Sequence, residues 1–310
     1  MTGPEPSSPA QLVLGTAQWG MAYGIANRHG QSSTDEVREI LEVARAGDVR
    51  ILDTARAYGQ SEEVIGSLTA DDPYWRIITK ISPELPDDEG AIVAKIKASL
   101  AQSRRALARD QLETVLLHRP DQLTRGDGAA WRHLLQQRQD GKIKRLGVSV
   151  QTPEQALELL DHPQVESLQV PFNLLDQRLR RANFFEQAKA ARKEIFVRSV
   201  FLQGLAFLPR KRLDASLEPL GVPLGALDRW ARDHELSLAG LFLRYARAQG
   251  LHLVLGCESA EQLRQNLATW RLGALAADHI QEVEALVPEL PAALLDPAQW
   301  QLSGLRTEPT

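Results

Sequence analysis

The sequence of 310 residues is poor in several features that mark particular classes of protein. It has one cysteine, Cys257, so no disulfide can form within the chain, and we expect a reducing, cytoplasmic location. No apolar run approaches the ~18 residues of a membrane span, and the polar, proline-containing residues 1–11 do not predict a signal or transit peptide. The 36 basic and 40 acidic residues give a net charge of −4, which predicts neither a nucleic-acid partner nor a membrane partner.

Other absences narrow the chemistry and the fold. No internal repeat and no low-complexity linker interrupts the chain. Among the seven histidines, no H-x₃-H pair and no carboxylate–histidine spacing stands out as a metal motif, so we expect no metal site. No G-x-G-x-x-G follows the first apolar run, which argues against the dinucleotide-binding half of an open doubly wound sheet.

Short apolar runs alternate with helical patterns along most of the chain. Runs this rich in Val, Ile and Leu are typical of strands buried on both faces of a parallel sheet. Helix-start signals occur between them, including capping patterns at residues 33–36 and 152–155. The eight expected strands are residues 12–15, 51–55, 77–81, 114–118, 146–149, 167–170, 195–200 and 253–257.

Eight strand–helix units in a chain of this length predict a (β/α)₈ barrel, the TIM-barrel fold, as a single domain over residues 1–310. The open doubly wound sheet is the alternative. Residues from about 291 onward fall beyond the last barrel helix and form a C-terminal extension. Because this extension carries Trp300 and Leu305, we expect it to pack onto the barrel.

Reactive groups in such barrels lie at the carboxyl ends of the strands and in the loops that follow. Three neighbouring strands place reactive residues there: Asp53, Lys80 and His118 lie at strand ends, and Tyr58 lies in the loop after the second strand. Each alone has an ordinary interpretation: a turn-capping aspartate, a loop aromatic, a solvated lysine and a core histidine. Together they say more, because an aspartate and a lysine at the ends of buried strands are costly unless they pair.

Such a pair would hold an ammonium group beside the phenol of Tyr58. A nearby cation stabilises phenolate and lowers the pKa of a phenol from about 10, which makes a phenol a competent general acid near neutral pH. A neutral His118 would donate a hydrogen bond to the same substrate oxygen. These roles predict the reduction of an aldehyde or ketone to an alcohol by hydride transfer, with Tyr58 as the general acid.

Two stretches resemble a known family. Residues 14–17 (LGTA) and 52–62 (LDTARAYGQSE) resemble the aldo-keto reductase family, and the similarity extends to about residue 267. That family reduces carbonyls with a nicotinamide cofactor on a (β/α)₈ barrel, using an Asp, Tyr, Lys and His tetrad. The resemblance implies an NAD(P)H-dependent enzyme with a small-molecule carbonyl substrate and the four residues above as its catalytic tetrad. NADP is the cofactor it implies, with NAD as the alternative, and it indicates no oligomeric state.

The resemblance also implies a set of cofactor contacts. Ser149 and Gln169 match residues that hold the nicotinamide carboxamide, although Val150 stands where the family commonly has Asn. Arg198 stands where an aromatic side chain usually stacks on the nicotinamide. A guanidinium can also stack, and a salt-bridged barrel residue is the other interpretation. The full set is Gly15, Thr16, Asp53, Ser149, Gln169, Arg198, Ser199, Leu202, Gly204, Gly256, Glu258, Gln262, Gln265 and Asn266.

The adenosine end of that set departs from the family pattern. Members that prefer NADP carry basic residues there, whereas this chain has Glu258 and Gln262, with Arg264 as the nearest cation. A carboxylate repels a 2′-phosphate but can bond a ribose hydroxyl. We therefore expect weaker discrimination for NADPH over NADH than is usual in the family. The ordinary interpretation of Glu258 is a solvated cap residue.

The substrate pocket is expected to include Trp19, Tyr23 and Arg119. Tyr23 is a rival phenol to the proposed acid, but no partner cation accompanies it in the motif. Two other functions stay open: a regulatory subunit that binds the cofactor and turns over slowly, and an aldolase that uses Lys80 as a Schiff-base nucleophile.

Overall fold

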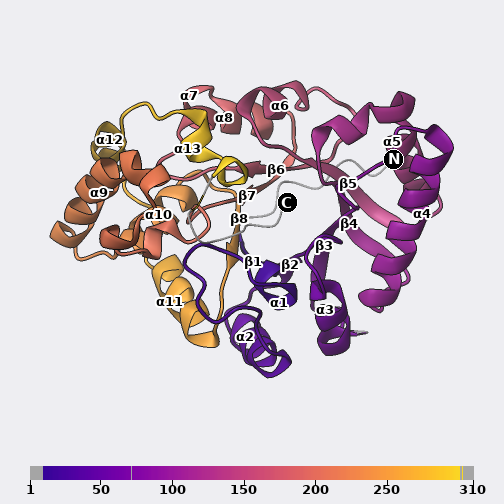
Figure 1. Ribbon diagram of the computed structural model, residues 1–310, viewed down its shortest axis with the longest axis horizontal. Coiled ribbons are helices and arrows are strands. Elements are labelled where there is room, and N and C mark those ends of the chain that lie inside the picture. Colours follow the sequence, from indigo (N-terminus) through magenta and orange to yellow (C-terminus); the bar gives the residue numbers. More distant parts are fainter. Residues whose placement is uncertain (1–9, 71, 301, 303–310) are drawn as a thin grey trace.

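The computed structural model, which describes residues 10–70, 72–300 and 302, is built around a closed barrel of eight parallel strands (Figure 1). Leu12 of the first strand lies opposite Leu253 of the last, and this pairing closes the sheet. The predicted (β/α)₈ fold is confirmed, and closure excludes the open doubly wound sheet. The strands are β1 (Leu12–Gly15), β2 (Ile51–Asp53), β3 (Arg76–Lys80), β4 (Leu112–Leu117), β5 (Ile143–Ser149), β6 (Ser167–Pro171), β7 (Glu194–Arg198) and β8 (His252–Gly256).

Each expected strand overlaps an observed one, and the differences lie at the ends. The expected run 195–200 extends two residues past the end of β7. The strand ends at Arg198 because the backbone turns sharply at Ser199, where φ is 61°. The run 51–55 likewise continues past β2 into a buried loop. Apolar residues thus continue beyond the strand pairing wherever the following loop is buried, and composition alone does not mark the last paired residue.

The strands divide the core into two parts, because successive side chains point to opposite faces. A small cluster fills the barrel and contains Val13, Ile51, Ile78, Leu116 and Phe196. The larger cluster lies between the strands and the surrounding helices. A filled barrel has no through channel, so a ligand can enter only at one end of it.

The helices surround the barrel (Figure 1). Predicted caps are confirmed: Ser33 and Glu36 form a capping box at the start of α2, and Thr152 and Gln155 form one at α6. The α-helices are α1 (Ala17–Gly20), α2 (Thr34–Ala46), α3 (Ser61–Thr69), α4 (Glu89–Ala106), α5 (Arg125–Gln139), α6 (Pro153–Glu158), α7 (Arg178–Arg181), α8 (Phe184–Ala190), α9 (Gly221–Asp233), α10 (Leu238–Arg247), α11 (Ala260–Arg271), α12 (Ala277–Ala285) and α13 (Ala292–Leu295). Short 3₁₀ helices are η1 (Pro120–Leu123), η2 (Leu205–Phe207), η3 (Arg210–Arg212), η4 (Ala215–Leu220) and η5 (Pro297–Gln299).

The C-terminal extension packs against the barrel where the structure describes it. Trp300 and Leu295 are buried in the large hydrophobic cluster, and the indole N–H of Trp300 donates a hydrogen bond of 3.2 Å to the carbonyl of Leu294 within the extension. The second residue expected to anchor the extension, Leu305, lies outside the described residues. A search of the described helices finds none that is long and apolar enough to cross a membrane.

Candidate active site

A buried ion pair lies at the carboxyl ends of β2 and β3. The Lys80 ammonium donates hydrogen bonds of 2.9 Å to each Asp53 carboxylate oxygen and one of 2.9 Å to the carbonyl of Thr54. The exposed fraction is 1% for Lys80 and 4% for Asp53. Burial would lower the pKa of Lys80, but the Asp53 carboxylate and the Tyr58 hydroxyl together raise it above the usual lysine value. Lys80 is therefore an ammonium ion at neutral pH.

Tyr58 lies against this ammonium. Its hydroxyl is 3.4 Å from Lys80 Nζ, and the same nitrogen lies 4.9 Å from the centre of the phenol ring. Two glycines let the Tyr58 loop approach α1 this closely: a Cβ on Gly20 would lie 1.8 Å from the Tyr58 carbonyl oxygen, and one on Gly59 would lie 2.2 Å from the Gly20 oxygen. The loop therefore seats the phenol beside the lysine by backbone contact.

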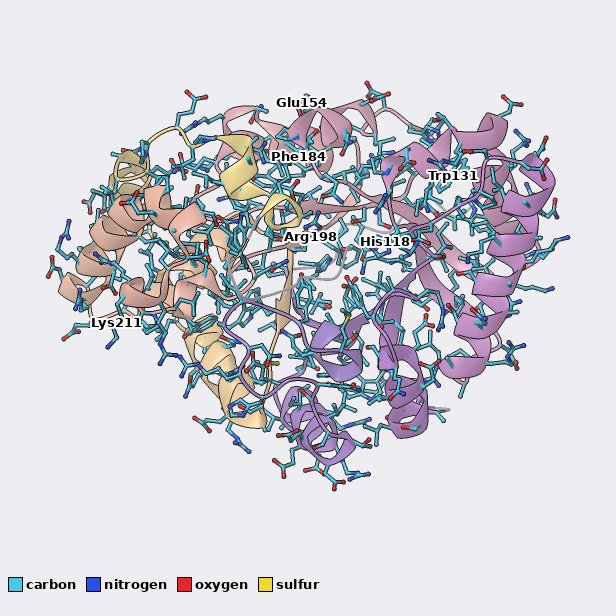
Figure 2. The ribbon with its side chains drawn as sticks, in the orientation of Figure 1. His118, Trp131, Glu154, Phe184, Arg198 and Lys211 are labelled. Atoms are coloured by element: carbon cyan, nitrogen blue, oxygen red, sulfur yellow. The ribbon has the colours of Figure 1, made fainter. Side chains whose placement is uncertain are left out.

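His118 directly follows β4 and meets Tyr58 edge-on, with ring centres 6.4 Å apart and an interplanar angle of 85°. Gln122 holds this turn, because its side-chain oxygen accepts the His118 backbone N–H at 2.9 Å. Figure 2 shows His118 near the centre of the barrel, as it does Arg198. Burial and the cations of Lys80, Arg198 and Arg119 lower the pKa of His118 to about 3. The imidazole is therefore neutral at physiological pH and can donate a hydrogen bond without carrying charge.

The lowered pKa of His118 predicts a pH dependence of stability. The pKa of the imidazole is its ordinary value of 6.5 in the unfolded chain and about 3 in the fold, so between these values only the unfolded chain binds the proton. The free energy of unfolding should therefore fall as the pH falls from 6.5 toward 3. Urea denaturation at about pH 7 and about pH 5 measures this: His118→Gln should lose less stability over the interval than the wild type. An equal loss of unfolding free energy in the wild type and in His118→Gln would contradict the lowered pKa of His118.

Comparison with known proteins gives this site its context. The sequence model of the Aldo/keto reductase family matches residues 11–288. The chain belongs to the aldo/keto reductase family. Oxidoreductase sirO of Leptosphaeria maculans is 25% identical to this reductase over 324 residues, covering 91% of this chain and 94% of that protein. D-threo-aldose 1-dehydrogenase from Pseudomonas sp is 24% identical over 302 residues, covering 84% and 92%. The protein is accordingly an oxidoreductase.

Solved structures share the same barrel. Aldo-keto reductase AKR11C1 from Bacillus halodurans, in a holo form, superposes with a TM-score of 0.70 at 19% identity, covering 91% of this chain and 97% of that chain. The glycerol dehydrogenase AKR11B4 from Gluconobacter oxydans superposes with a TM-score of 0.70 at 21% identity, covering 90% and 94%. At these identities the likeness shows the fold.

The reductase has a cavity of about 500 Å³ at the carboxyl ends of its strands. All four expected tetrad residues line it, as does Tyr23. Leu202, Asn266, Trp19 and Arg119 are not among its lining residues, and Trp19 lies fully buried in the core. The expected cofactor residues that line it, besides Asp53, are Gly15, Thr16, Ser149, Gln169, Arg198, Ser199, Gly204, Gly256, Glu258, Gln262 and Gln265.

Gln169 makes a contact that the sequence did not predict. Its side-chain N–H donates a hydrogen bond of 2.7 Å to Asp53 Oδ1, so the carboxylate is held by both Lys80 and Gln169. The side-chain oxygen of Gln169 is buried without a hydrogen-bond partner among the residues described. Ser149 lies next to it, opposite in the β5–β6 register. A buried, unpaired acceptor on a cavity wall suits an amide N–H donor from a ligand.

Arg198 and Tyr23 both line this cavity, and each differs from a simple charged or acidic group. The Arg198 guanidinium donates to neutral oxygens, at 3.1 Å to Ser199 Oγ and 3.1 Å to the carbonyl of Val150, which disfavours its interpretation as a salt-bridged residue. Burial, with Tyr58 adding to it, raises the pKa of Tyr23 to about 12 although Arg198 opposes the shift. Tyr23 is thus a weaker acid than an unperturbed phenol, and it is not the phenol held against Lys80.

At the end of the cavity where adenosine is expected, Ser259 caps α11, the helix that follows β8, and Gln262 lies in the first turn of that helix. The Gln262 side-chain oxygen accepts the backbone N–H of Glu258 at 2.9 Å, while Ser259 Oγ accepts the backbone N–H of Gln262 at 3.2 Å. Arg264, the nearest cation in the sequence, pairs instead with Glu261 at 3.3 Å and does not line the cavity. The only charged side chain of this turn that lines the cavity is therefore the Glu258 carboxylate, within the part of the chain that is described.

The loop between α1 and α2 adds cavity residues that the sequence analysis missed. Arg28 and His29 line the cavity, and both side chains are exposed. Asn27 shapes this loop, because its side-chain N–H donates to the Tyr23 and Gly30 carbonyls at 3.1 and 2.9 Å. No motif marks these positions, since a loop of irregular structure sets where its side chains reach. They add a guanidinium and an imidazole to the cavity wall.

Proposed function

We propose that this aldo/keto reductase reduces an aldehyde or ketone to an alcohol with a reduced nicotinamide cofactor, NADPH or NADH. The observation that carries the proposal is the hydrogen-bonded chain from Asp53 through Lys80 to the Tyr58 hydroxyl, open to a cavity that His118 also lines. When bound, the cofactor supplies a hydride to the carbonyl carbon. The charge that develops on the carbonyl oxygen then needs a proton donor and a hydrogen-bond donor.

Tyr58 is the proposed proton donor. The Lys80 ammonium, 3.4 Å from its hydroxyl, stabilises the phenolate left after the proton is given up. Asp53 keeps that ammonium in place, and Gln169 in turn orients Asp53. Neutral His118 would donate a hydrogen bond to the same carbonyl oxygen and fix its direction without competing as an acid, because its pKa is about 3.

The cavity residues fit a nicotinamide cofactor. The unpaired oxygen of Gln169 and the neighbouring hydroxyl of Ser149 suit the donor and acceptor of a carboxamide. Arg198, whose planar guanidinium is tethered at the carbonyl of Val150, offers a flat face on the same wall. The cap of α11 and its free backbone N–H groups lie beside Glu258, where a polar adenosine ribose would be held.

Cofactor preference tests the assignment of the adenosine end. Glu258→Arg should raise the ratio of kcat/KM for NADPH to that for NADH by roughly tenfold, because a hydrogen bond to a charged group contributes about 1.5–3 kcal/mol. The turnover number should change little, since the contact is remote from the reacting carbon. Steady-state kinetics with both cofactors measures this, and Glu258→Gln, which removes the carboxylate without adding a cation, should shift the ratio less.

Substitution of Arg28 provides a second variant for that experiment. If the wild type is strongly selective for NADPH, Arg28→Gln should reduce the selectivity, because Arg28 is an exposed guanidinium that lines the same cavity as Glu258. Strong NADPH selectivity that survives in Arg28→Gln, together with no response to Glu258→Arg, would contradict the placement of the ribose at this turn.

The two other functions are less consistent with the site. A Schiff-base aldolase needs a neutral amine, whereas Asp53 and Tyr58 raise the pKa of Lys80 and three acceptors engage its nitrogen. A regulatory subunit that only binds cofactor has no use for Tyr58, Lys80 and His118 together on one cavity wall. Borohydride trapping of a substrate adduct on Lys80 would favour the aldolase, and cofactor binding without turnover on an aldehyde panel would favour the regulatory subunit.

A further inference from the structure

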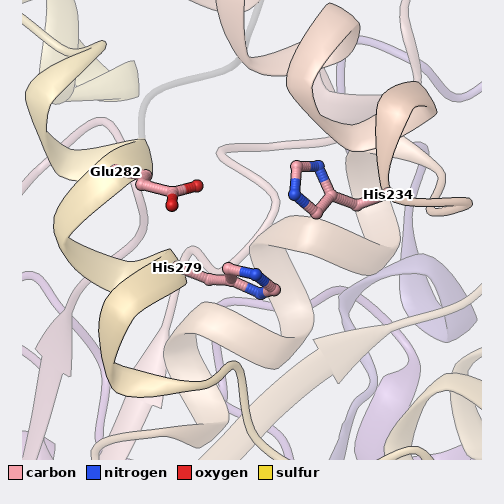
Figure 3. A group of neighbouring side chains, drawn as sticks. All are labelled: His234, His279 and Glu282. Atoms are coloured by element: carbon pink, nitrogen blue, oxygen red, sulfur yellow. The ribbon is translucent and has the colours of Figure 1, made fainter.

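A second group of chemically reactive side chains lies away from the cavity, between α9 and α12 (Figure 3). His234 is the residue that ends α9, and His279 and Glu282 lie on one face of α12, three positions apart. One ligand atom from each of the three lies within 4.8 Å of the other two. None of the three lines the central cavity. We propose that this group binds a divalent zinc ion.

The hydrogen bonding of His234 prepares it for this role. Its Nδ1 lies 2.8 Å from the carbonyl oxygen of Trp230. A carbonyl oxygen only accepts, so Nδ1 carries the proton and Nε2 keeps a free lone pair. A histidine ligand to a metal typically donates its other ring N–H to such a carbonyl. Trp230 also stacks on the imidazole at 3.7 Å, with an interplanar angle of 13°, which fixes the ring orientation.

Trp230 positions the carboxylate as well. Its indole N–H donates a hydrogen bond of 2.9 Å to Glu282 Oε2, which leaves the second carboxylate oxygen for a cation. The ring of His279 meets the rings of His234 and Trp230 edge-on, with centres 4.9 and 5.2 Å apart. One tryptophan thus orients two of the three proposed ligands and packs against the third.

The donor set matches zinc chemistry. Two imidazole nitrogens and one carboxylate oxygen, with water in the fourth position, form a known tetrahedral arrangement whose bonds of about 2.0–2.2 Å place ligand atoms roughly 3.3 Å apart. The ligand atoms, now within 4.8 Å of one another, would have to move closer to bind zinc, and the exposed Glu282 and half-buried His279 are the side chains expected to rotate.

The charges around the group also favour a cation. Asp278 lies at the start of α12, where its carboxylate accepts the backbone N–H of His279 at 2.9 Å. The carbonyl end of α9 adds partial negative charge at His234. The nearby Arg232 is paired with Asp228 at 2.7 Å, which offsets its repulsion.

The sequence analysis expected no metal, and the reason is visible in the ligand spacing. His279 and Glu282 form a carboxylate–histidine pair three residues apart that is common on helices by chance, and the remaining ligand comes from another helix. Only the fold brings His234 to them. Bound zinc would join the end of α9 to α12 and stabilise their packing.

Calorimetric titration of the full, tag-free, chelator-treated chain with zinc chloride tests the proposal. We expect one zinc ion per chain and a higher melting temperature with zinc than without it. His234→Gln and His279→Gln should abolish this binding, and Trp230→Phe, which removes the indole N–H donor and part of the surface that packs on the two imidazoles, should weaken it by about 10–100-fold. Reductase activity of His279→Gln should equal that of the wild type, which separates this site from the proposed catalytic one.

His162→Gln is the matched control. His162 also meets a tryptophan edge-on, Trp131, with ring centres 5.9 Å apart, but it belongs to no group of three possible ligands among the described residues. Zinc affinity should be unchanged in this variant. Zinc-free melting curves that match the wild type establish that each variant is folded. Wild-type binding no tighter than that of His234→Gln, or an equal loss in His162→Gln, would overturn the proposal.

Discussion

The Tyr58→Phe variant is expected to turn over an aldehyde about 10²–10⁴ times more slowly than the wild type, which is the usual contribution of general acid catalysis. The substitution removes only the hydroxyl that lies 3.4 Å from Lys80 Nζ. His118 and Tyr23, which line the same cavity, are poor replacements for that donor, because His118 is neutral with a pKa of about 3 and the pKa of Tyr23 is raised to about 12. Single-turnover kinetics with saturating cofactor measures the effect on the chemical step.

Tyr23→Phe is the matched control for that result. It removes a second phenol from the same cavity, one with no ammonium beside it, and should change turnover by no more than a few fold. Cofactor affinity, measured by quenching of nicotinamide fluorescence, should be nearly unchanged in Tyr58→Phe. Wild-type turnover in Tyr58→Phe, or a larger loss in Tyr23→Phe, would assign the proton to another donor.

The Lys80→Met variant is expected to lose both activity and stability. It leaves the Asp53 carboxylate, 4% exposed, without its cation, and an uncompensated buried charge costs about 3–5 kcal/mol. The hydrogen bond from Gln169 remains and offsets part of that loss. Catalysis should fall further than in Asp53→Asn, since the ammonium that stabilises phenolate is absent in the first variant and present in the second.

Urea denaturation and steady-state kinetics of both variants separate the two effects. The double variant, Lys80→Met with Asp53→Asn, should recover stability relative to Lys80→Met, because no buried charge is left unpaired. It should not recover activity. A greater catalytic loss in Asp53→Asn than in Lys80→Met would contradict the proposed order of contacts from Asp53 through Lys80 to Tyr58.

The barrel was predictable because its signal is local. Each strand is a short run of branched apolar residues, and the eight runs appear in order along the chain. Three of the tetrad residues were placed by their positions at the carboxyl ends of such runs, and Tyr58 by the loop motif that follows β2. The strand ends were less predictable, as at Ser199, because a buried loop has the same apolar composition as a strand.

Contacts between segments that are far apart in the sequence could not be predicted from such local patterns. Gln169 bonds Asp53 across 116 positions of the sequence, and no spacing rule connects them. Trp19, expected in the substrate pocket, belongs to the large hydrophobic cluster and does not line the cavity, because it lies on the buried part of α1. Arg28 reaches the cavity only through the shape of the loop that Asn27 holds.

The most direct test of the account follows deuterium from the cofactor to the product. Wild-type enzyme in ordinary water is mixed with NADPH or NADH that carries two deuterium atoms at C4 of the nicotinamide. A panel of aldehydes and ketones is added, and the alcohols formed are analysed by mass spectrometry. The account predicts an alcohol that carries deuterium at the former carbonyl carbon, formed far more slowly by Tyr58→Phe. An alcohol without deuterium, or a borohydride-trapped substrate adduct on Lys80 with no cofactor consumed, would contradict it.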